Sequence, residues 1–363
     1  MIGGGIIGCA AAMELAGRGA AVTLLEAEQT GVRATGASGG MLAPQYEAGA
    51  PGPLFELAVL GRAVFPAFAR RVEALAEWPV GLRADGMLVA NRSAAEEADA
   101  RAALAWQHAA GLRGEILTPA DARRLHAGLA PDVASWLWLP DEAQVDAQRL
   151  AVAIGTAASA AGARVRIGQD IAAIESRHGR VSGVRTAAGD VLPADAVVLA
   201  AGAWSGRVAG VPHPLPVRPV RGQMLRLQPA AMPGWPLVAT HDARYLVPRE
   251  NGTILLGSTM EDAGFDDATD PAAQVVLAEQ GAALVPALAD ARIVEAWAGL
   301  RPITPDRWPI VGPEPELEGL FYATGHGRNG ILLGPLTARI VADLVLTGES
   351  DVGWEALRPE RFR

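Results

Sequence analysis

Apolar and polar residues alternate along this chain with two different periods, which predicts a mixture of helices and strands. Apolar residues three and four positions apart predict helices over residues 54–78, 94–110, 119–126, 146–161, 271–285 and 331–347. Short apolar runs bounded by turn-forming residues predict strands over residues 87–90, 136–140, 164–167, 171–175, 181–186, 196–201, 217–227, 244–247, 253–257, 292–298 and 320–325. The pattern therefore favours an α/β fold.

Two of the predicted strands differ in character from the others. Residues 196–201 are uniformly apolar, as in a strand buried on both faces, and Gly202 follows them directly. Residues 320–325 form a similar run that leads into a glycine-rich loop. The strands between residues 217 and 298 instead include a hairpin signal, Asn251-Gly252. We expect this β-rich unit to interrupt the layers that the rest of the chain forms.

The first 26 residues hold the most specific signal. A stub of strand leads into Gly3-Gly4-Gly5-Ile6-Ile7-Gly8, a helix of small residues follows, and a second apolar run ends at Glu26. Gly3 permits a tight turn, Gly5 lets the backbone approach a pyrophosphate, and Gly8 lets helix and strand pack closely. The helix start offers N–H groups to the phosphate, and Glu26 can accept hydrogen bonds from a ribose. Together these features predict a dinucleotide site.

Two features surround this signal. Residues 31–44 form a loop of small residues, which suggests backbone lying against a flat ligand. Only Met1 and Ile2 precede the glycines, whereas a central strand usually has about five or six residues. Either the first strand is shortened or the natural start lies upstream, and a shortened strand predicts lower stability and weaker cofactor retention.

Composition narrows the class of protein. The 363 residues are half apolar and one fifth charged, which is ordinary for a globular protein. No uninterrupted apolar run approaches the roughly 18 residues of a membrane span, and no leader peptide is recognisable, so we expect a cytoplasmic protein without a membrane span. The net charge of −9 argues against nucleic acid as a partner.

The counts of two residue types exclude several chemistries. Cys9 is the only cysteine, so a disulfide, a cysteine zinc cluster and a Cys-x-x-Cys redox pair are excluded. All 31 basic residues are arginines, which excludes a pyridoxal-phosphate Schiff base, a Walker-type lysine and a lysine base. We expect no metal site.

With these residues in view, nearly the whole chain resembles the D-amino-acid oxidase superfamily of flavoenzymes, and within it the glycine oxidase branch of thiamine biosynthesis. The most specific matching segments are Gly40-Met41-Leu42-Ala43-Pro44, Tyr245-Leu246-Val247-Pro248-Arg249, Gly257-Ser258-Thr259-Met260, Gly299-Leu300-Arg301-Pro302-Ile303-Thr304-Pro305-Asp306 and Gly325-His326-Gly327-Arg328-Asn329-Gly330-Ile331-Leu332.

This resemblance implies the fold and the cofactor. It implies non-covalent FAD in a discontinuous Rossmann-like domain, assigned to residues 1–85, 141–215 and 300–363. It further implies an α+β substrate domain built on an antiparallel sheet, assigned to residues 86–140 and 216–299. A homotetramer is also expected from the resemblance.

The resemblance also implies roles for individual residues. Arg301 matches the arginine that anchors the substrate carboxylate, Tyr245 a neighbouring hydroxyl donor, and Arg328 a second arginine at the site. Met41 and Met260 match apolar residues that line a small pocket. The positions expected to contact FAD are Gly3, Gly5, Ile6, Ile7, Gly8, Glu26, Ala27, Ala34, Thr35, Gly39, Gly40, Met41, Ile171 near the adenine, Gly202, and His326, Gly327, Arg328, Asn329, Gly330, Ile331 and Leu332 along the isoalloxazine.

The residue types suit oxidation of a small amine or amino acid. A guanidinium can hold a carboxylate through two parallel hydrogen bonds, which fixes orientation as well as charge. Hydride would then pass from the substrate Cα to flavin N5, and the resemblance implies that O2 is then reduced to H2O2. No dedicated acid or base is needed, so His241 and His326 are expected to be structural. The position of a histidine found in some relatives is Ala243 here.

Several alternatives stay open from the sequence. Arg301 can instead form a structural ion pair with Asp306. The enzyme can be a dehydrogenase that passes electrons to a quinone, or the chain can be a non-catalytic nucleotide-binding module. NAD is conceivable as well, because Glu26 can bind ribose in either cofactor.

Overall fold

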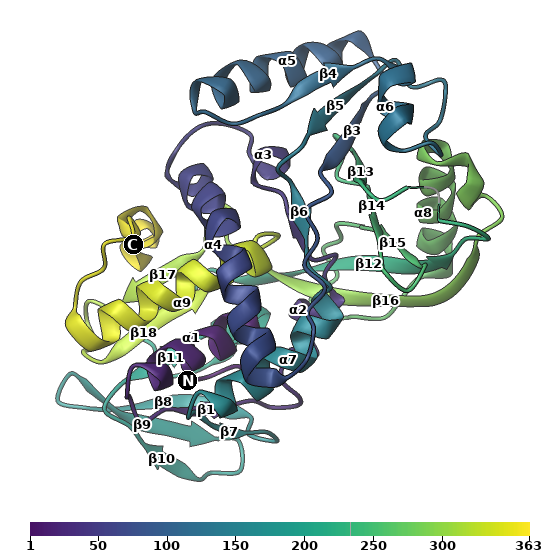
Figure 1. Cartoon of the computed structure of the whole chain (residues 1–363). Coiled ribbons are helices and arrows are strands. Elements are labelled where there is room, and N and C mark those ends of the chain that lie inside the picture. Colours follow the sequence, from purple (N-terminus) through teal and green to yellow (C-terminus); the bar gives the residue numbers. More distant parts are fainter. Residues whose placement is uncertain (233) are drawn as a thin grey trace.

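The computed structural model describes residues 1–232 and 234–363, and most of its strands belong to two large sheets (Figure 1). The strands of the first sheet are β7 (Arg164–Arg166), β1 (Thr23–Leu25), β11 (Val197–Leu199), β18 (Leu320–Thr324) and β17 (Ile310–Pro313). Ile2 bridges β1 and β11 in parallel register, so the residue before the glycine loop lies at the centre of this sheet. Only β17 at the edge runs antiparallel to its neighbour.

Helices cover one face of the first sheet (Figure 1). They are α1 (Ile6–Gly17), α4 (Pro53–Ala76), α7 (Ala147–Ala160) and α9 (Gly330–Thr347). Three consecutive alanines of α1, residues 10–12, are fully buried, because small side chains let this helix lie close to the sheet and to α9. In the described part of the chain, α9 alone is long and apolar enough to cross a membrane by length and composition. Since 61% of it is buried among α1, α4 and the sheet, it serves as a core helix.

A small antiparallel sheet lies on the opposite face. Its strands are β8 (Ile171–Arg177), β9 (Arg180–Thr186) and β10 (Val191–Pro193). Ile174 and Val184 of this sheet pack against Leu25 and Leu199 of the first sheet in one apolar cluster. The first sheet is therefore buried on both faces, which explains the uniformly apolar run at β11.

The second large sheet has eight strands in the order β16-β12-β15-β14-β13-β3-β5-β4. Their bounds are β16 (Arg292–Ile303), β12 (Arg218–Gln228), β15 (Ile254–Gly257), β14 (Tyr245–Pro248), β13 (Leu237–Thr240), β3 (Met87–Asn91), β5 (Ser135–Leu139) and β4 (Glu115–Leu117). Only β13 and β3 pair in parallel. Helices α6 (Pro119–Leu125) and α8 (Pro271–Leu284) pack on one face, and α5 (Ala94–Ala109) packs on the other.

Short elements connect these layers. They are α2 (Ala34–Ala37), α3 (Pro44–Glu47), the pair β2 (Met41–Leu42) and β6 (Ala143–Gln144), and the 3-10 turns η1 (Gly202–Arg207), η2 (Pro286–Leu288), η3 (Glu355–Leu357) and η4 (Pro359–Phe362). The long strand β16 reaches from the second sheet to the first, where the Pro302 carbonyl accepts a hydrogen bond of 2.8 Å from the Gly327 N–H. This contact places the end of β16 against the glycine-rich loop at residues 325–330.

The α/β fold predicted from the sequence is confirmed, including its β-rich unit between residues 217 and 298. The loop predicted over residues 31–44 is wrong in part, because α2, β2 and the first residue of α3 interrupt it. The strand predicted over residues 292–298 continues to Ile303, since β12 pairs with β16 along its whole length. The division into two domains at the stated boundaries stays a prediction.

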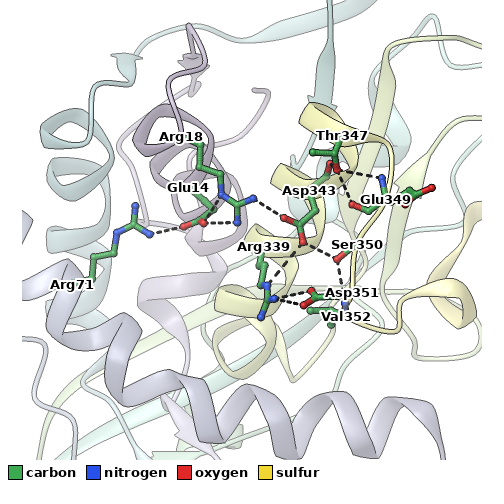
Figure 2. Close-up of polar contacts among 10 residues, drawn as sticks. All are labelled: Glu14, Arg18, Arg71, Arg339, Asp343, Thr347, Glu349, Ser350, Asp351 and Val352. Atoms are coloured by element: carbon green, nitrogen blue, oxygen red, sulfur yellow. Dashed lines mark hydrogen bonds and ion pairs between the residues drawn. The ribbon is translucent and has the colours of Figure 1, made fainter.

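A polar network on the surface joins the ends of three helices (Figure 2). Arg18, which directly follows α1, donates to Asp343 of α9 at 2.5 Å, and Glu14 of α1 accepts from both Arg18 and Arg71 of α4. Exposed ion pairs of this kind each contribute about 0–1 kcal/mol to stability. The apolar core therefore determines how these helices pack, and the network only helps to orient them.

Candidate active site

A cavity of about 610 Å³ runs between the two large sheets. Its volume falls within the range of about 300–1,000 Å³ that is usual for ligand sites. Most of the residues predicted to bind cofactor or substrate line it, namely Gly3, Gly5, Ile6, Ile7, Glu26, Ala27, Ala34, Thr35, Gly39, Gly40, Met41, Ile171, Gly202, Tyr245, Arg301, His326, Gly327, Arg328, Asn329, Gly330 and Ile331. Segments from both ends and the middle of the chain thus meet at one cavity.

The glycine loop builds one end of the cavity. Gly3 has φ +100°, and a Cβ there would lie 2.4 Å from the Ala200 carbonyl oxygen. A Cβ on Gly8 would lie 1.9 Å from the Gly3 carbonyl oxygen. A Cβ on Gly5 would meet no atom closer than Thr35 Oγ1 at 3.5 Å, so the backbone of Gly5 is open to the cavity. Each glycine therefore fits the role predicted for it.

Glu26 lies directly after β1 and beside this loop. Its carboxylate accepts hydrogen bonds from the Gly4 N–H at 2.6 Å and from the Glu28 N–H at 2.9 Å. Thr35 of α2 accepts a hydrogen bond of 3.0 Å from the Ile6 N–H, at the first turn of α1. The loop, the acid and the start of α1 therefore form one connected unit that faces the cavity.

The middle of the cavity is lined by the turn at residues 38–41. Gly40 has φ +72°, and a Cβ there would lie 2.0 Å from the Val145 carbonyl oxygen. Arg249, which directly follows β14 and is 4% exposed, donates to the Gly39 carbonyl at 2.9 Å and to Gln144 Oε1 at 2.7 Å. Burial lowers the pKa of Arg249 to about 10, so this guanidinium is still cationic at neutral pH. Its buried charge holds a backbone turn in place.

Arg301 lies near the far end of the cavity, on β16 opposite Val220 of β12. Its guanidinium passes directly over Gly222, where a Cβ would lie 2.0 Å from Nη1. Arg301 donates to the Ser258 hydroxyl at 2.5 Å and to the Thr259 carbonyl at 3.2 Å. Among the described residues, no carboxylate pairs with it. The alternative ion pair with Asp306 is wrong, because Asp306 pairs with Arg361 at 2.7 Å.

Tyr245 of β14 is 5% exposed and borders the same end of the cavity. Its hydroxyl donates to the Met224 sulfur at 3.3 Å, and its ring lies so close to Gly39 that a Cβ there would be 2.8 Å from Cε2. Burial lowers the pKa of Arg301, while the adjacent Tyr245 acts in the opposite direction. The two side chains therefore form a polar corner in a largely apolar wall.

Arg328 differs from Arg301 because it has an acidic partner. Its Nε and Nη2 atoms donate to the two carboxylate oxygens of Glu47, each at 2.7 Å. Burial acts to lower the pKa of Arg328, but Glu47 more than offsets this, so the pKa lies above its ordinary value. Glu47 itself lines the cavity. It was not predicted as a site residue, because no local pattern marks a residue whose partner is 281 positions away.

Three predicted residues are not part of the cavity wall. Met260 is 44% exposed and is not among the residues that line the cavity. Leu332 is 1% exposed and packs in the helical core, because one turn of α9 directs it away from the cavity. Gly8 acts through its contact with Gly3 and does not line the cavity itself. Pocket lining by Met260 is thus not supported by its position.

His326 is 3% exposed, and its Nε2 lies 3.0 Å from the Thr337 hydroxyl of α9. Burial lowers its pKa to about 3. An imidazole that stays neutral at every ordinary pH suits a structural role, as predicted for it. His241 contacts Asn91 Oδ1 at 2.8 Å and does not line the cavity.

The low pKa of His326 predicts a pH dependence of stability. The unfolded chain binds the proton at pH below about 6.5 and the folded chain only near pH 3, so stability falls as the pH drops through this window. Between pH 6.5 and pH 5 the loss is roughly 2 kcal/mol from this residue. Chemical denaturation at both pH values should show this loss in the wild type and a smaller one in His326→Gln. Equal losses in the two proteins would contradict the assignment.

The cavity fits FAD. Its glycine-lined end has the tight turn, the close helix–strand packing and the helix N-terminus that a pyrophosphate needs, with Glu26 placed for a ribose. The other end, beside residues 326–331, offers apolar walls and backbone that suit a flat ring system. This fold and cavity define a dinucleotide-binding enzyme of the α/β class.

Comparisons with known proteins agree with this class. Residues 1–344 match the profile of the DAO family, described as FAD dependent oxidoreductase. Glycine oxidase of Geobacillus kaustophilus is 34% identical over 347 residues, which cover 95% of this chain and 92% of that protein. The bifunctional protein ThiO/ThiG of a Nostoc species is 36% identical over 97% of this chain. The match covers only 53% of that relative, so this chain spans about half of its length.

Solved structures give the same picture. The crystal structure of glycine oxidase from Geobacillus kaustophilus matches with a TM-score of 0.93 at 32% identity, covering 98% of this chain and 96% of that chain. An L-proline dehydrogenase from P. horikoshii matches with a TM-score of 0.90 at 23% identity, which shows a shared fold. The chain belongs to the DAO family of FAD-dependent oxidoreductases.

Proposed function

We propose that this protein oxidises glycine and other small amines or D-amino acids to the corresponding imines, which hydrolyse with loss of the amine. The observation that supports this most is Arg301, a guanidinium without a carboxylate partner among the described residues, in the same cavity as the glycine loop. The similarity to glycine oxidases over more than nine tenths of both chains points to the same substrates.

The residues of the chain would chiefly bind and orient the substrate. Arg301 can hold a carboxylate through two parallel hydrogen bonds, and Tyr245 can add a third donor beside it. When bound, FAD supplies the two-electron acceptor that takes a hydride from the substrate Cα. This orientation brings the Cα–H bond to one fixed place, which is the main contribution that hydride transfer needs from the protein.

The start of α9 can stabilise negative charge in the cavity. Asn329 precedes this helix and its side chain makes no capping hydrogen bond, while the backbone of Gly330 and Ile331 lines the cavity. Free amides at the N-terminus of a long helix favour an anionic group. These amides would stabilise the negative charge that FAD gains on reduction.

The mode of cofactor binding, the electron acceptor and the cellular role complete the proposal. The only cysteine, Cys9, lies buried in α1 and outside the cavity wall, which supports non-covalent FAD. We propose O2 as the electron acceptor, with H2O2 as product, and an imine that supplies thiazole synthesis for thiamine, as the family likeness implies. A cytoplasmic homo-oligomer stays a prediction.

One panel of substrates tests the proposal. The FAD-loaded protein should release H2O2 in air with glycine, sarcosine and D-alanine, in an amount equal to the amine consumed. Reduction of a quinone analogue without H2O2 would favour the alternative, a dehydrogenase. Colourless purified protein that cannot be loaded with FAD would contradict both.

A further inference from the structure

Two guanidinium groups line the substrate end of the cavity, and they differ in one respect. Among the described residues, Arg301 donates to the neutral oxygens of Ser258 and Thr259 and has Tyr245 beside it, but it has no carboxylate partner. Arg328 is held by both carboxylate oxygens of Glu47. Glu47 and Arg328 are 15% and 21% exposed, so this ion pair is mostly shielded from water but still borders the cavity.

Glu47 is fixed in position by contacts that do not involve Arg328. It is the last residue of the single-turn helix α3, whose Gln45 and Tyr46 N–H groups donate to Glu142 at 2.7 and 3.2 Å. Glu142 is fully buried and pairs with Arg62 of α4 at 2.9 Å. The Tyr46 hydroxyl donates to the Thr240 carbonyl at 2.8 Å. The chain therefore holds an acid at the cavity wall through its own backbone.

Arg328 is fixed from the other side. It follows Gly327, whose N–H donates to the Pro302 carbonyl next to Arg301. Burial and Tyr245 have the largest effects on the pKa of Arg301. Of the two other charged groups, Arg328 lowers this pKa and Glu47 raises it. The three charged groups thus form one electrostatic unit with a single net positive charge.

We propose that Glu47 determines specificity by neutralising Arg328, so that the site accepts amines with one carboxylate and discriminates against those with two. This inference rests on the proposed function for the class of substrate. A substrate's first carboxylate would meet Arg301, and a second one would meet an arginine whose Nε and Nη2 already donate to Glu47, together with an acid of like charge. Two carboxylates brought together in a partly buried site repel each other and oppose binding. If the substrate displaced Glu47 from Arg328, the Glu47 carboxylate would lose its hydrogen-bonding partner.

A matched pair of inert ligands tests the proposal without any turnover. Methoxyacetate has one carboxylate, and oxydiacetate has the same chain with a second carboxylate at its other end. Neither has an amine to oxidise, so calorimetric titration of the FAD-loaded protein measures binding alone. We expect wild-type protein to bind oxydiacetate no tighter than methoxyacetate.

Removing the acid should reverse this preference. In Glu47→Gln the Kd ratio of the two ligands should shift by about tenfold or more in favour of oxydiacetate, because a charged hydrogen-bonding partner becomes available. Glu47→Asp keeps the charge and should keep the ratio nearer to the wild-type value. Adding Arg328→Gln to Glu47→Gln should abolish the gain.

Two results would overturn the inference. One is wild-type protein that binds oxydiacetate about tenfold tighter than methoxyacetate, since Arg328 would then be available despite Glu47. The other is a ratio that does not change in Glu47→Gln. The wild-type measurement needs no variant to fold. Because both ligands are inert, failure here is distinguishable from failure of the H2O2 assay, which tests the proposed function itself.

Discussion

Replacing Arg301 with lysine should lower kcat/KM for glycine by about 100-fold, mainly through a higher KM. A lysine ammonium is a point charge, and it cannot reproduce the two parallel hydrogen bonds of a guanidinium with a carboxylate. Losing one partner of such a pair costs about 2–5 kcal/mol, which corresponds to roughly 30-fold to several thousandfold and includes this factor. Initial rates of H2O2 release over a range of glycine concentrations measure the effect.

A matched control separates this effect from a general change of charge. Arg218 lies on the adjacent strand β12, pairs with Asp262 at 3.2 Å and is 56% exposed. Arg218→Lys should therefore leave kcat/KM within about twofold of the wild type, because exposed ion pairs contribute little. An Arg301→Lys variant with unchanged apparent affinity for glycine would count against Arg301 as the anchor.

Substituting Gly8 with alanine should weaken FAD binding by about one to two orders of magnitude. The new Cβ would lie 1.9 Å from the Gly3 carbonyl oxygen, so α1 or the glycine loop has to move. Overpacking of this kind costs about 1–3 kcal/mol, which weakens cofactor affinity by about 5- to 150-fold when it distorts the binding loop. Flavin absorbance per protein and the denaturation midpoint should both fall.

Gly353→Ala is the matched control for this substitution. Nothing lies within 4 Å of a Cβ at Gly353, and its φ is not in the left-handed region. Its flavin content and stability should match the wild type. Normal flavin content in Gly8→Ala would show that the loop tolerates the displacement, and the packing role of Gly8 would be wrong.

The sequence predicted those parts of the site whose structure depends on residues close together in the chain. A turn with positive φ, as at Gly3 and Gly40, and the acid that ends the second strand each leave a pattern within a few residues. The uniformly apolar strand β11 is recognisable because burial on both faces removes alternation. These patterns depend only on neighbouring residues, so they are readable without the fold.

The parts that the sequence did not predict depend on contacts across the chain. Glu47 is defined by Arg328 and by Glu142, and Arg249 is defined by the Gly39 carbonyl 210 positions away. The strands β13 and β17 were also not predicted from the sequence. Met260 is assigned to the pocket from the resemblance alone, and in the structure it is exposed and outside the cavity wall.

The central claim is that one cavity brings the glycine loop, the start of α9 and an unpaired arginine around a single FAD. A crystal structure of the FAD-loaded protein with methoxyacetate tests it most directly. We predict the ligand carboxylate about 2.7–2.9 Å from the Arg301 guanidinium, with the ligand's methylene facing the isoalloxazine ring. A carboxylate bound elsewhere, with Arg301 contacting only protein atoms, would contradict the account.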